Sequence, residues 1–183
     1  PDFTTTKLSA AGLVYKHYGK EVILALHPHL EGQSKKINDV HIKMYKSFME
    51  AIDAIDNGVE PFDGNPKYRD TTGLSERVKR LNPRWNDTPP ADGNTSLVED
   101  TKFEVASEMC GNDFANVLSY IVECELSAKD LVDSAILSRS EVSPNGDIIV
   151  FKNGGMPWKS HLYDLEAEYG IEGKLKFVLY EDQ

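Results

Sequence analysis

The chain has 183 residues, enough for one domain with a hydrophobic core or for one domain with a small additional lobe. Its 20 Lys and Arg residues against 30 Asp and Glu residues give a net charge of −10, which disfavours nonspecific binding to nucleic acid or anionic lipid but allows a local basic site. No apolar run reaches the length of roughly 18 residues that suggests a membrane span, and no signal-peptide pattern opens the sequence. The two cysteines have no spacing typical of a metal site or a disulfide framework. We therefore expect a reduced, intracellular protein of the cytoplasm, nucleus or mitochondrion. Without an apolar run of membrane-spanning length, we expect it not to bind membranes.

Residues 4–35 predict two short helices. Thr4, Thr5 or Thr6 can cap the first, which carries an apolar face and is expected to end at Gly19. The second, over residues 21–26, is expected to break at His27-Pro28-His29. This triplet is more typical of a surface turn than of a metal site, since no third ligand is nearby.

A long amphipathic helix is predicted from Lys36 to Asp56, where apolar residues recur at spacings of three and four. They are Ile37, Val40, Met44, Phe48, Ile52 and Ile55. Asp56 falls four residues after Ile52, so we expect it on the apolar face. A helix C-terminus already carries negative partial charge, and a carboxylate there costs up to about 1 kcal/mol. Asp56 should therefore have a cationic partner, which could be Arg, Lys or a metal ion, although Asp-Asn-Gly is also ordinary turn chemistry.

The next predicted helix, over residues 71–81, carries positive charge. Arg77 and Arg80 are three positions apart and share one helix face, within a basic cluster that also contains Lys67, Arg69, Lys79 and Arg84. Tyr68 and Trp85 add aromatic surfaces nearby. Such a cluster can bind phosphates and bases, or it can be a solvated face paired with acidic side chains; the sequence leaves both interpretations open.

The remaining residues predict three more helices, over 98–109, 114–125 and 127–137, with a break at Gly111-Asn112-Asp113 and a cap at Ser127. Residues 147–151 and 176–180 have the composition of strands. Between them, Gly154-Gly155 leads to Trp158, Lys159 and His161 just before a helix, where a helix N-terminus could bind an anion; a buried Trp beside an exposed Lys is the alternative. The fold class is therefore α/β, mainly helical with a small sheet from the C-terminal third, and we divide it into a helical part (residues 1–138) and an α/β segment (residues 139–183).

Several stretches together resemble the melanocyte-proliferating-gene family. They are Thr6–Tyr15, Ile52–Gly58, Leu74–Asn86, Pro157–Tyr163 and Phe177–Tyr180. The resemblance covers nearly the whole chain and is weakest over residues 21–34 and 86–96. Members of this family are regarded as metal-dependent phosphoesterases of the Asp-His-His class with 3′–5′ RNA exonuclease activity. The resemblance thus implies an Asp-His-His phosphoesterase-like fold, RNA or another phosphodiester as substrate, and a divalent metal, Mn²⁺ or Mg²⁺.

The sequence also departs from the family pattern. The family begins with a His-Cys-Asp-Glu metal motif, a lone Asp and the Asp-His-His triplet, and none of these occurs here. The triplet would lie not far upstream of Pro1, and a C-terminal segment with a Gly-Gly substrate motif would follow Gln183. We therefore expect this chain to be the central piece of a longer protein and to have no phosphodiesterase activity alone, because the absent residues would hold most of the metal.

The resemblance implies roles for particular residues. Of the metal ligands of the class, only the last is expected here, an Asp after a core helix; we match it to Asp56, with Asp53 as an alternative or supporting ligand. Substrate-binding roles fall on Arg77, Arg80, Asn82, Trp158, Lys159 and His161, with Trp158 or Trp85 offering a stacking surface. The rival interpretation is a non-enzymatic helical interaction module that binds an acidic partner through its Arg cluster and the segment around Trp158. The sequence does not fix the oligomeric state.

Overall fold

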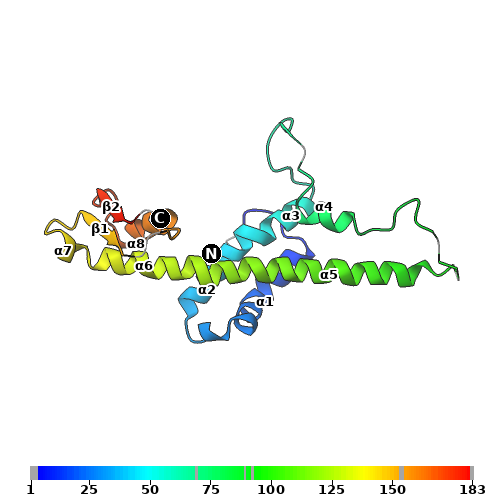
Figure 1. Cartoon of the computed structure of the whole chain (residues 1–183), viewed down its shortest axis with the longest axis horizontal. Coiled ribbons are helices and arrows are strands. Elements are labelled where there is room, and N and C mark those ends of the chain that lie inside the picture. Colours follow the sequence, from blue (N-terminus) through cyan, green and yellow to red (C-terminus); the bar gives the residue numbers. More distant parts are fainter. Residues whose placement is uncertain (1–3, 69, 89, 92, 153–154, 182–183) are drawn as a thin grey trace. The chain divides into compact units, whose positions relative to one another are not determined.

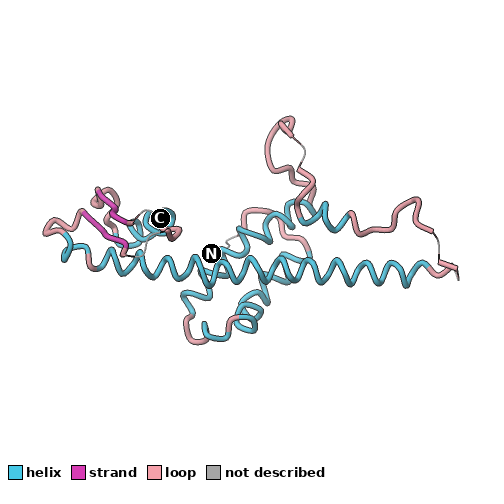
Figure 2. The backbone as a smooth tube through the Cα atoms, in the orientation of Figure 1, coloured by secondary structure: helices cyan, strands magenta, loops and turns pink. Residues whose placement is uncertain are grey.

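The computed structural model describes residues 4–68, 70–88, 90–91, 93–152 and 155–181 (Figure 1). It divides into two compact units, Pro1–Leu118 and Ser119–Gln183. In chain order, the elements are α1 (Ala10–Leu26), the 3-10 turn η1 (Pro28–Leu30), α2 (Ser34–Met44), the π-helical turn η2 (Tyr45–Met49), α3 (Glu50–Asp56), α4 (Leu74–Lys79), α5 (Thr95–Ser119), the π-helical turn η3 (Tyr120–Glu125), α6 (Leu126–Leu137), α7 (Arg139–Val142), β1 (Ile148–Phe151), α8 (Lys159–Tyr169) and β2 (Phe177–Tyr180). The prediction of a mainly helical chain with a small C-terminal sheet is confirmed (Figure 2).

Helix α1 is longer than the sequence predicted. It continues past Gly19 to Leu26, so the expected helix end at Gly19 and the separate second helix are wrong. Gly19 is buried, and a Cβ placed there would lie 2.8 Å from ring atoms of both His41 and Tyr15. The residue therefore permits close packing of α1 against α2 rather than ending the helix.

The helical stretch from Ser34 to Asp56 forms as predicted, but its buried face shifts partway along. The Glu50 N–H bonds to the Tyr45 carbonyl, five residues back, which makes η2 a π-helical turn with one extra residue. Met49, the last residue of the turn, and Asp53 are buried, whereas the 3.6-residue periodicity placed Phe48, Ile52 and Asp56 inside. The expectation that Asp56 faces the core is therefore wrong: Asp56 is exposed, and Asp53 takes the inward position.

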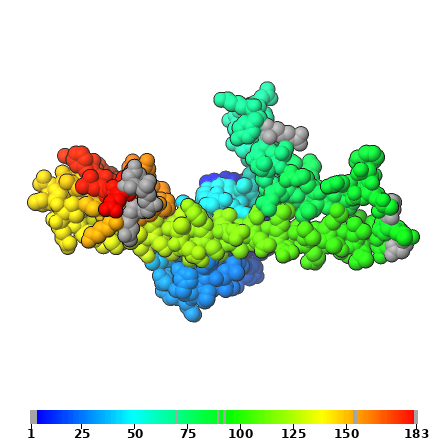
Figure 3. Space-filling view, in the orientation of Figure 1, coloured from blue at the N-terminus to red at the C-terminus, as the bar shows by residue number. Residues whose placement is uncertain are grey.

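Helix α5 also runs farther than predicted. It passes through Gly111 without a break and continues by way of η3 into α6, so Ser127 caps no helix. Contacts near the C-terminal end of α5 hold it to the rest of the first unit: Asp113 pairs with Arg77, and the Phe114 ring contacts the rings of Tyr15 and Phe48. These contacts outweigh the weak local preference of Gly and Asn for a helix end. Between α3 and α4, the described part of residues 58–73 is exposed (Figure 3).

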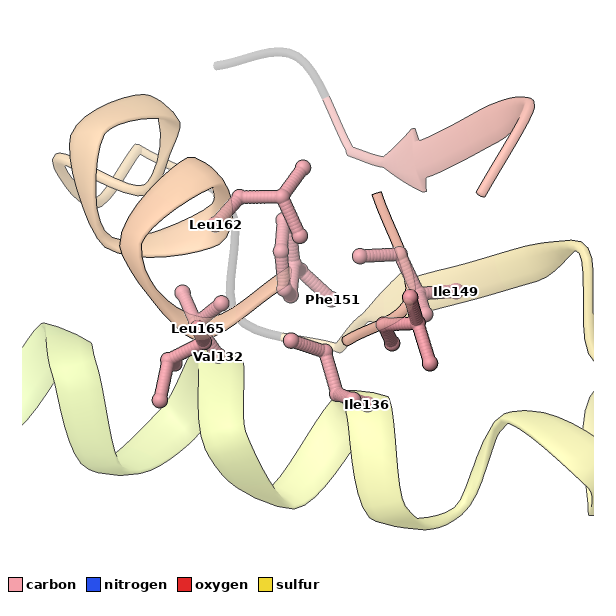
Figure 4. Close-up of a cluster of buried hydrophobic side chains, with 7 residues drawn as sticks. Val132, Ile136, Ile149, Phe151, Leu162 and Leu165 are labelled. Atoms are coloured by element: carbon pink, nitrogen blue, oxygen red, sulfur yellow. The ribbon is translucent and has the colours of Figure 1, made fainter. Parts of the chain in front are cut away.

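The second unit contains a two-stranded sheet with helices packed on it. Strands β1 and β2 are parallel, with Ile148 opposite Phe177, and α8 connects them, which confirms both predicted strands and the predicted helix. Side chains from α6, β1 and α8, together with one residue just after α8, form the core (Figure 4). They are Val132, Ile136, Ile149, Phe151, Leu162, Leu165 and Ile171. Helix α6 packs against β1 and α8.

In the described ranges, no helix is both long and apolar enough to cross a membrane.

Candidate functional site

Asp53 forms the centre of a buried hydrogen-bond network. Its carboxylate is fully buried and accepts hydrogen bonds from the Ser9 N–H at 3.0 Å, the Ser9 hydroxyl at 2.6 Å and the Tyr45 hydroxyl at 3.1 Å. Ser9 also caps α1, because its Oγ accepts from the Gly12 N–H at 3.2 Å. The carboxylate therefore lies at the positive end of α1. Three donors and the helix dipole stabilise it, and no salt bridge to Asp53 occurs among the residues that the structure describes.

A second set of contacts fixes the segment before α1, Thr4–Ser9, which we call the leading segment. The hydroxyls of Thr5 and Thr6 donate to Glu50 Oε1, and Asn57 Nδ2 donates to the Lys7 carbonyl at 2.9 Å. The Thr5 hydrogen bond is the main reason that the pKa of Glu50 lies below its ordinary value. Together with Asp53, these contacts attach the leading segment along α3.

The spacing of polar residues on α3 is a sequence signal for its contact with the leading segment, and the pattern of apolar residues does not reveal it. Glu50, Asp53 and Asn57 are spaced by three and four residues, so they share one face of a helix. A polar set that shares one helix face indicates a partner segment that hydrogen-bonds to it. The partner itself has no local signal, because Ser9 is 44 residues away from Asp53 in the sequence.

Asp56 lies outside this network. It is exposed at the C-terminal end of α3, where water screens the interaction between a carboxylate and the helix dipole. The argument that Asp56 requires a cation, which depended on its facing the core, therefore does not hold. Among the described residues, no group of three or more His, Cys, Asp or Glu side chains is arranged to hold a metal ion, so a metal at Asp56 would need further ligands from outside these residues.

The two arginines of the α4 cluster have different environments. Arg77 is half-buried and forms an ion pair with Asp113 of α5, with Nη1 and Oδ2 2.5 Å apart. Arg80 is exposed, and its Nη1 donates to the Thr71 carbonyl at 2.7 Å. Thus Arg77 fits the interpretation of the cluster as paired with acidic side chains, while Arg80 keeps an exposed guanidinium. Arg69, another member of the cluster, lies outside the described residues.

Asn82 follows α4 and lies in a shallow groove of about 460 Å³ between α4 and α5. The groove is lined also by Glu99, Asp100 and Lys102. Two carboxylates against one ammonium make this groove a poor site for a phosphate group.

Trp158, Lys159 and His161 lie at the start of α8 in the second unit. The Trp158 ring packs 5.7 Å from Phe151 and 5.8 Å from Tyr180, centroid to centroid, and Lys159 Nζ lies 5.7 Å from the Trp158 ring centroid. Trp158 is thus a partly buried ring next to the core, with a cation–π contact to an exposed lysine. Its ring has less free surface for stacking than Trp85, which is almost fully exposed. Gly154 lies outside the described residues.

Comparison with known proteins gives a consistent result. A family model described as "Uncharacterised protein family (UPF0160)" and labelled as the MYG1 exonuclease matches residues 1–183. The "MYG1 exonuclease" of Bos taurus is 39% identical over 179 residues, which cover 97% of this chain and 45% of that protein. The "MYG1 protein C27H6.8" of Caenorhabditis elegans is 37% identical over 180 residues, covering 97% of this chain and 50% of that protein. The "MYG1 protein YER156C" of Saccharomyces cerevisiae is 38% identical over 184 residues, covering 97% and 52%.

The chain therefore spans about half the length of the curated relatives that it matches. No solved structure matches it.

Proposed function

This chain belongs to the MYG1 exonuclease family, described as uncharacterised protein family UPF0160, and on that basis we propose that it is the central part of a metal-dependent phosphoesterase that degrades RNA from its 3′ end. The observation that carries the proposal is the match to this family along the whole chain, with relatives that are named exonucleases. The Asp-His-His phosphoesterase-like fold, the RNA substrate and the 3′–5′ direction are part of the proposal.

The proposed cofactor is a divalent metal, Mn²⁺ or Mg²⁺, held mostly by residues outside this chain. Such ions generate hydroxide near neutral pH and stabilise in-line displacement at phosphorus. Asp56 is the proposed ligand from this chain, because its carboxylate is exposed at the end of α3 and oxygen ligands suit these metals.

Asp53 receives a different role. Its carboxylate already accepts three hydrogen bonds in the interior, so metal binding would require breaking them. We propose that Asp53 and Asn57 position α3 on the leading segment, and that Asp56, three residues after Asp53, is oriented as a consequence. Asp53 is then a positioning residue for the metal site.

For the substrate, we propose Arg80 and Lys159 as phosphate contacts, because both charged groups are exposed. His161 remains a proposed contact near the start of α8. Arg77 and Trp158 are weaker candidates, since Asp113 pairs with the first and Phe151 and Tyr180 pack against the second.

The test is an exonuclease assay on the intact protein with RNA labelled at its 5′ end, in Mn²⁺ or Mg²⁺ and in excess chelator. A 3′–5′ exonuclease shortens this RNA stepwise and keeps the label on the products. Asp56→Asn should lower the rate by at least about 100-fold while the protein stays folded. Asp63→Asn is the matched control, because Asp63 is an exposed aspartate in the loop after α3, and it should leave the rate unchanged.

Unchanged activity of the Asp56→Asn protein would refute the ligand assignment, and release of labelled mononucleotide at the start would refute the direction. The 183-residue chain alone should cleave no RNA in either metal. Cleavage that copurifies with the chain alone would contradict the view that most ligands lie elsewhere.

A further inference from the structure

Helix α1 has an apolar face that no other described part of its unit covers. Val14, Tyr18 and Val22 are spaced four residues apart and are 60%, 57% and 40% exposed. They form one side of a groove of about 490 Å³, which we call the α1 groove; it is lined by Ala10, Ala11, Val14, Tyr15, Tyr18, Gly19, Val22, Met49 and Phe114.

The α1 groove offers almost no polar atoms to an occupant. The hydroxyl of Tyr15 is buried and donates to the His41 carbonyl at 2.9 Å, and the other lining side chains are apolar except for the Tyr18 hydroxyl. A nucleic acid or a charged peptide would lose hydration here without gaining hydrogen bonds. The groove instead fits the apolar side of a helix or strand.

We propose that the α1 groove is the docking surface for the segment that precedes Pro1 in the intact protein. The matched relatives are about twice as long as this chain, so the intact protein has a large further part to place. The leading segment is attached to α3 and runs directly into Ala10 and Ala11, which line the groove. A preceding segment would therefore be connected to the groove through the leading segment.

This inference rests on family membership and on the geometry of the first unit, and does not require the metal site. Its test therefore uses structural readouts that remain informative even if the proposed phosphoesterase activity is absent.

The first experiment replaces Tyr18 in the intact protein with the photo-crosslinking residue p-benzoylphenylalanine. After irradiation, mass spectrometry should identify an intramolecular crosslink to a peptide upstream of Pro1. Replacing His17 in the same way is the control, because His17 is exposed on α1 and lies outside the groove; this variant should not yield that crosslink.

The competing occupants give different results. A crosslink between isotopically distinct copies would show that a second copy fills the groove, and a crosslink to a peptide downstream of Gln183 would show that the C-terminal part does. Either result overturns the proposal. Absence of any crosslink at Tyr18 would show that the groove faces solvent, which overturns it as well.

The second experiment compares Val14→Asp with His17→Asp in the intact protein. Both changes place Asp in the interior of α1, so the loss of helix propensity is shared. If Val14 is buried under the preceding segment, only Val14→Asp should lower Tm by roughly 5 °C or more. Equal Tm values for the two variants would contradict the proposal.

Discussion

Replacement of Gly12 by alanine should strongly destabilise the protein, although alanine normally favours a helix. Gly12 lies in the first turn of α1 and is buried against Asp53. A Cβ at this position would overlap both carboxylate oxygens of Asp53 and lie 2.6 Å from its Cγ. Van der Waals contacts of a methyl group need roughly 3.5 Å, so the carboxylate would have to move by about 1 Å.

The size of the effect follows from the bonds that such a movement breaks. The Asp53 carboxylate accepts from Ser9 N–H, Ser9 Oγ and Tyr45 OH, and hydrogen bonds to a charged group contribute about 1.5–3 kcal/mol each. Losing two of them would cost about 3–6 kcal/mol, offset by about 1 kcal/mol from the higher helix propensity of alanine. We expect Gly12→Ala to lower the free energy of unfolding by roughly 2–5 kcal/mol.

Gly111 provides the matched control. It lies in the interior of α5, is exposed, and a methyl group added there would meet no atom within 4 Å among the described residues. Gly111→Ala should therefore raise the free energy of unfolding by about 0.5–1 kcal/mol. Urea unfolding followed by circular dichroism measures both changes. If Gly12→Ala is as stable as Gly111→Ala, the Asp53 network does not hold α1 and α3 together as described.

Two further predictions concern charged groups of the first unit. Burial is the main reason that the pKa of His41 lies below its ordinary value of 6.5. The unfolded state therefore binds a proton more readily than the folded state. The contribution of His41 to the free energy of unfolding is fully present above pH 6.5 and should fall as the pH drops below it. His41→Asn should reduce this slope of Tm against pH between about 7 and about 5, and an unchanged slope would exclude His41 as its source. In the intact protein, Arg80→Ala should weaken RNA binding and reduce the slope of log Kd against log salt concentration by roughly one unit. Arg77→Ala should mainly lower Tm, because Arg77 pairs with Asp113. The opposite pattern would assign the phosphate contact to Arg77 and the structural role to Arg80.

The parts of the fold that the sequence predicted well depend on neighbouring residues. Strand β1 follows a Pro144-Asn145-Gly146 turn and has an apolar run of strand length, and α8 ends at Gly170 in the left-handed conformation that favours glycine. Turn chemistry and short apolar runs are local properties, so one sequence is enough to detect them.

The errors arose where distant contacts override local preference. Gly19 was expected to end a helix, but it lies beneath His41 and Tyr15. Gly111 was expected to break α5, but Asp113 and Phe114 hold the helix to other elements. In each case a packing partner more than about 20 residues away decides the outcome, and propensity alone contains no information about it.

At the candidate site, contacts between distant residues likewise decided which single carboxylate is buried. The family resemblance matched the metal ligand to Asp56, with Asp53 as the alternative, and the helical periodicity separately placed Asp56 on the apolar face. The extra residue in η2 shifts that periodicity by one position, so Asp53 is buried and Asp56 is exposed. A π-helical turn has no simple sequence signal, since it depends on how the flanking helices pack.

The π-helical turn η2 also has an evolutionary consequence. A π-helical turn is equivalent to an α-helix with one inserted residue, and Ser47 within it is exposed. Deleting Ser47 would restore a continuous α-helix. Met49 and Asp53 would then follow Met44 by about one and two helical turns, so the repeat of about 3.6 residues would place both side chains on the inward face. Family members that lack one residue at this point can therefore keep the same buried carboxylate, and a single-residue gap in their alignment would mark a change of helix type without loss of the Asp53 network.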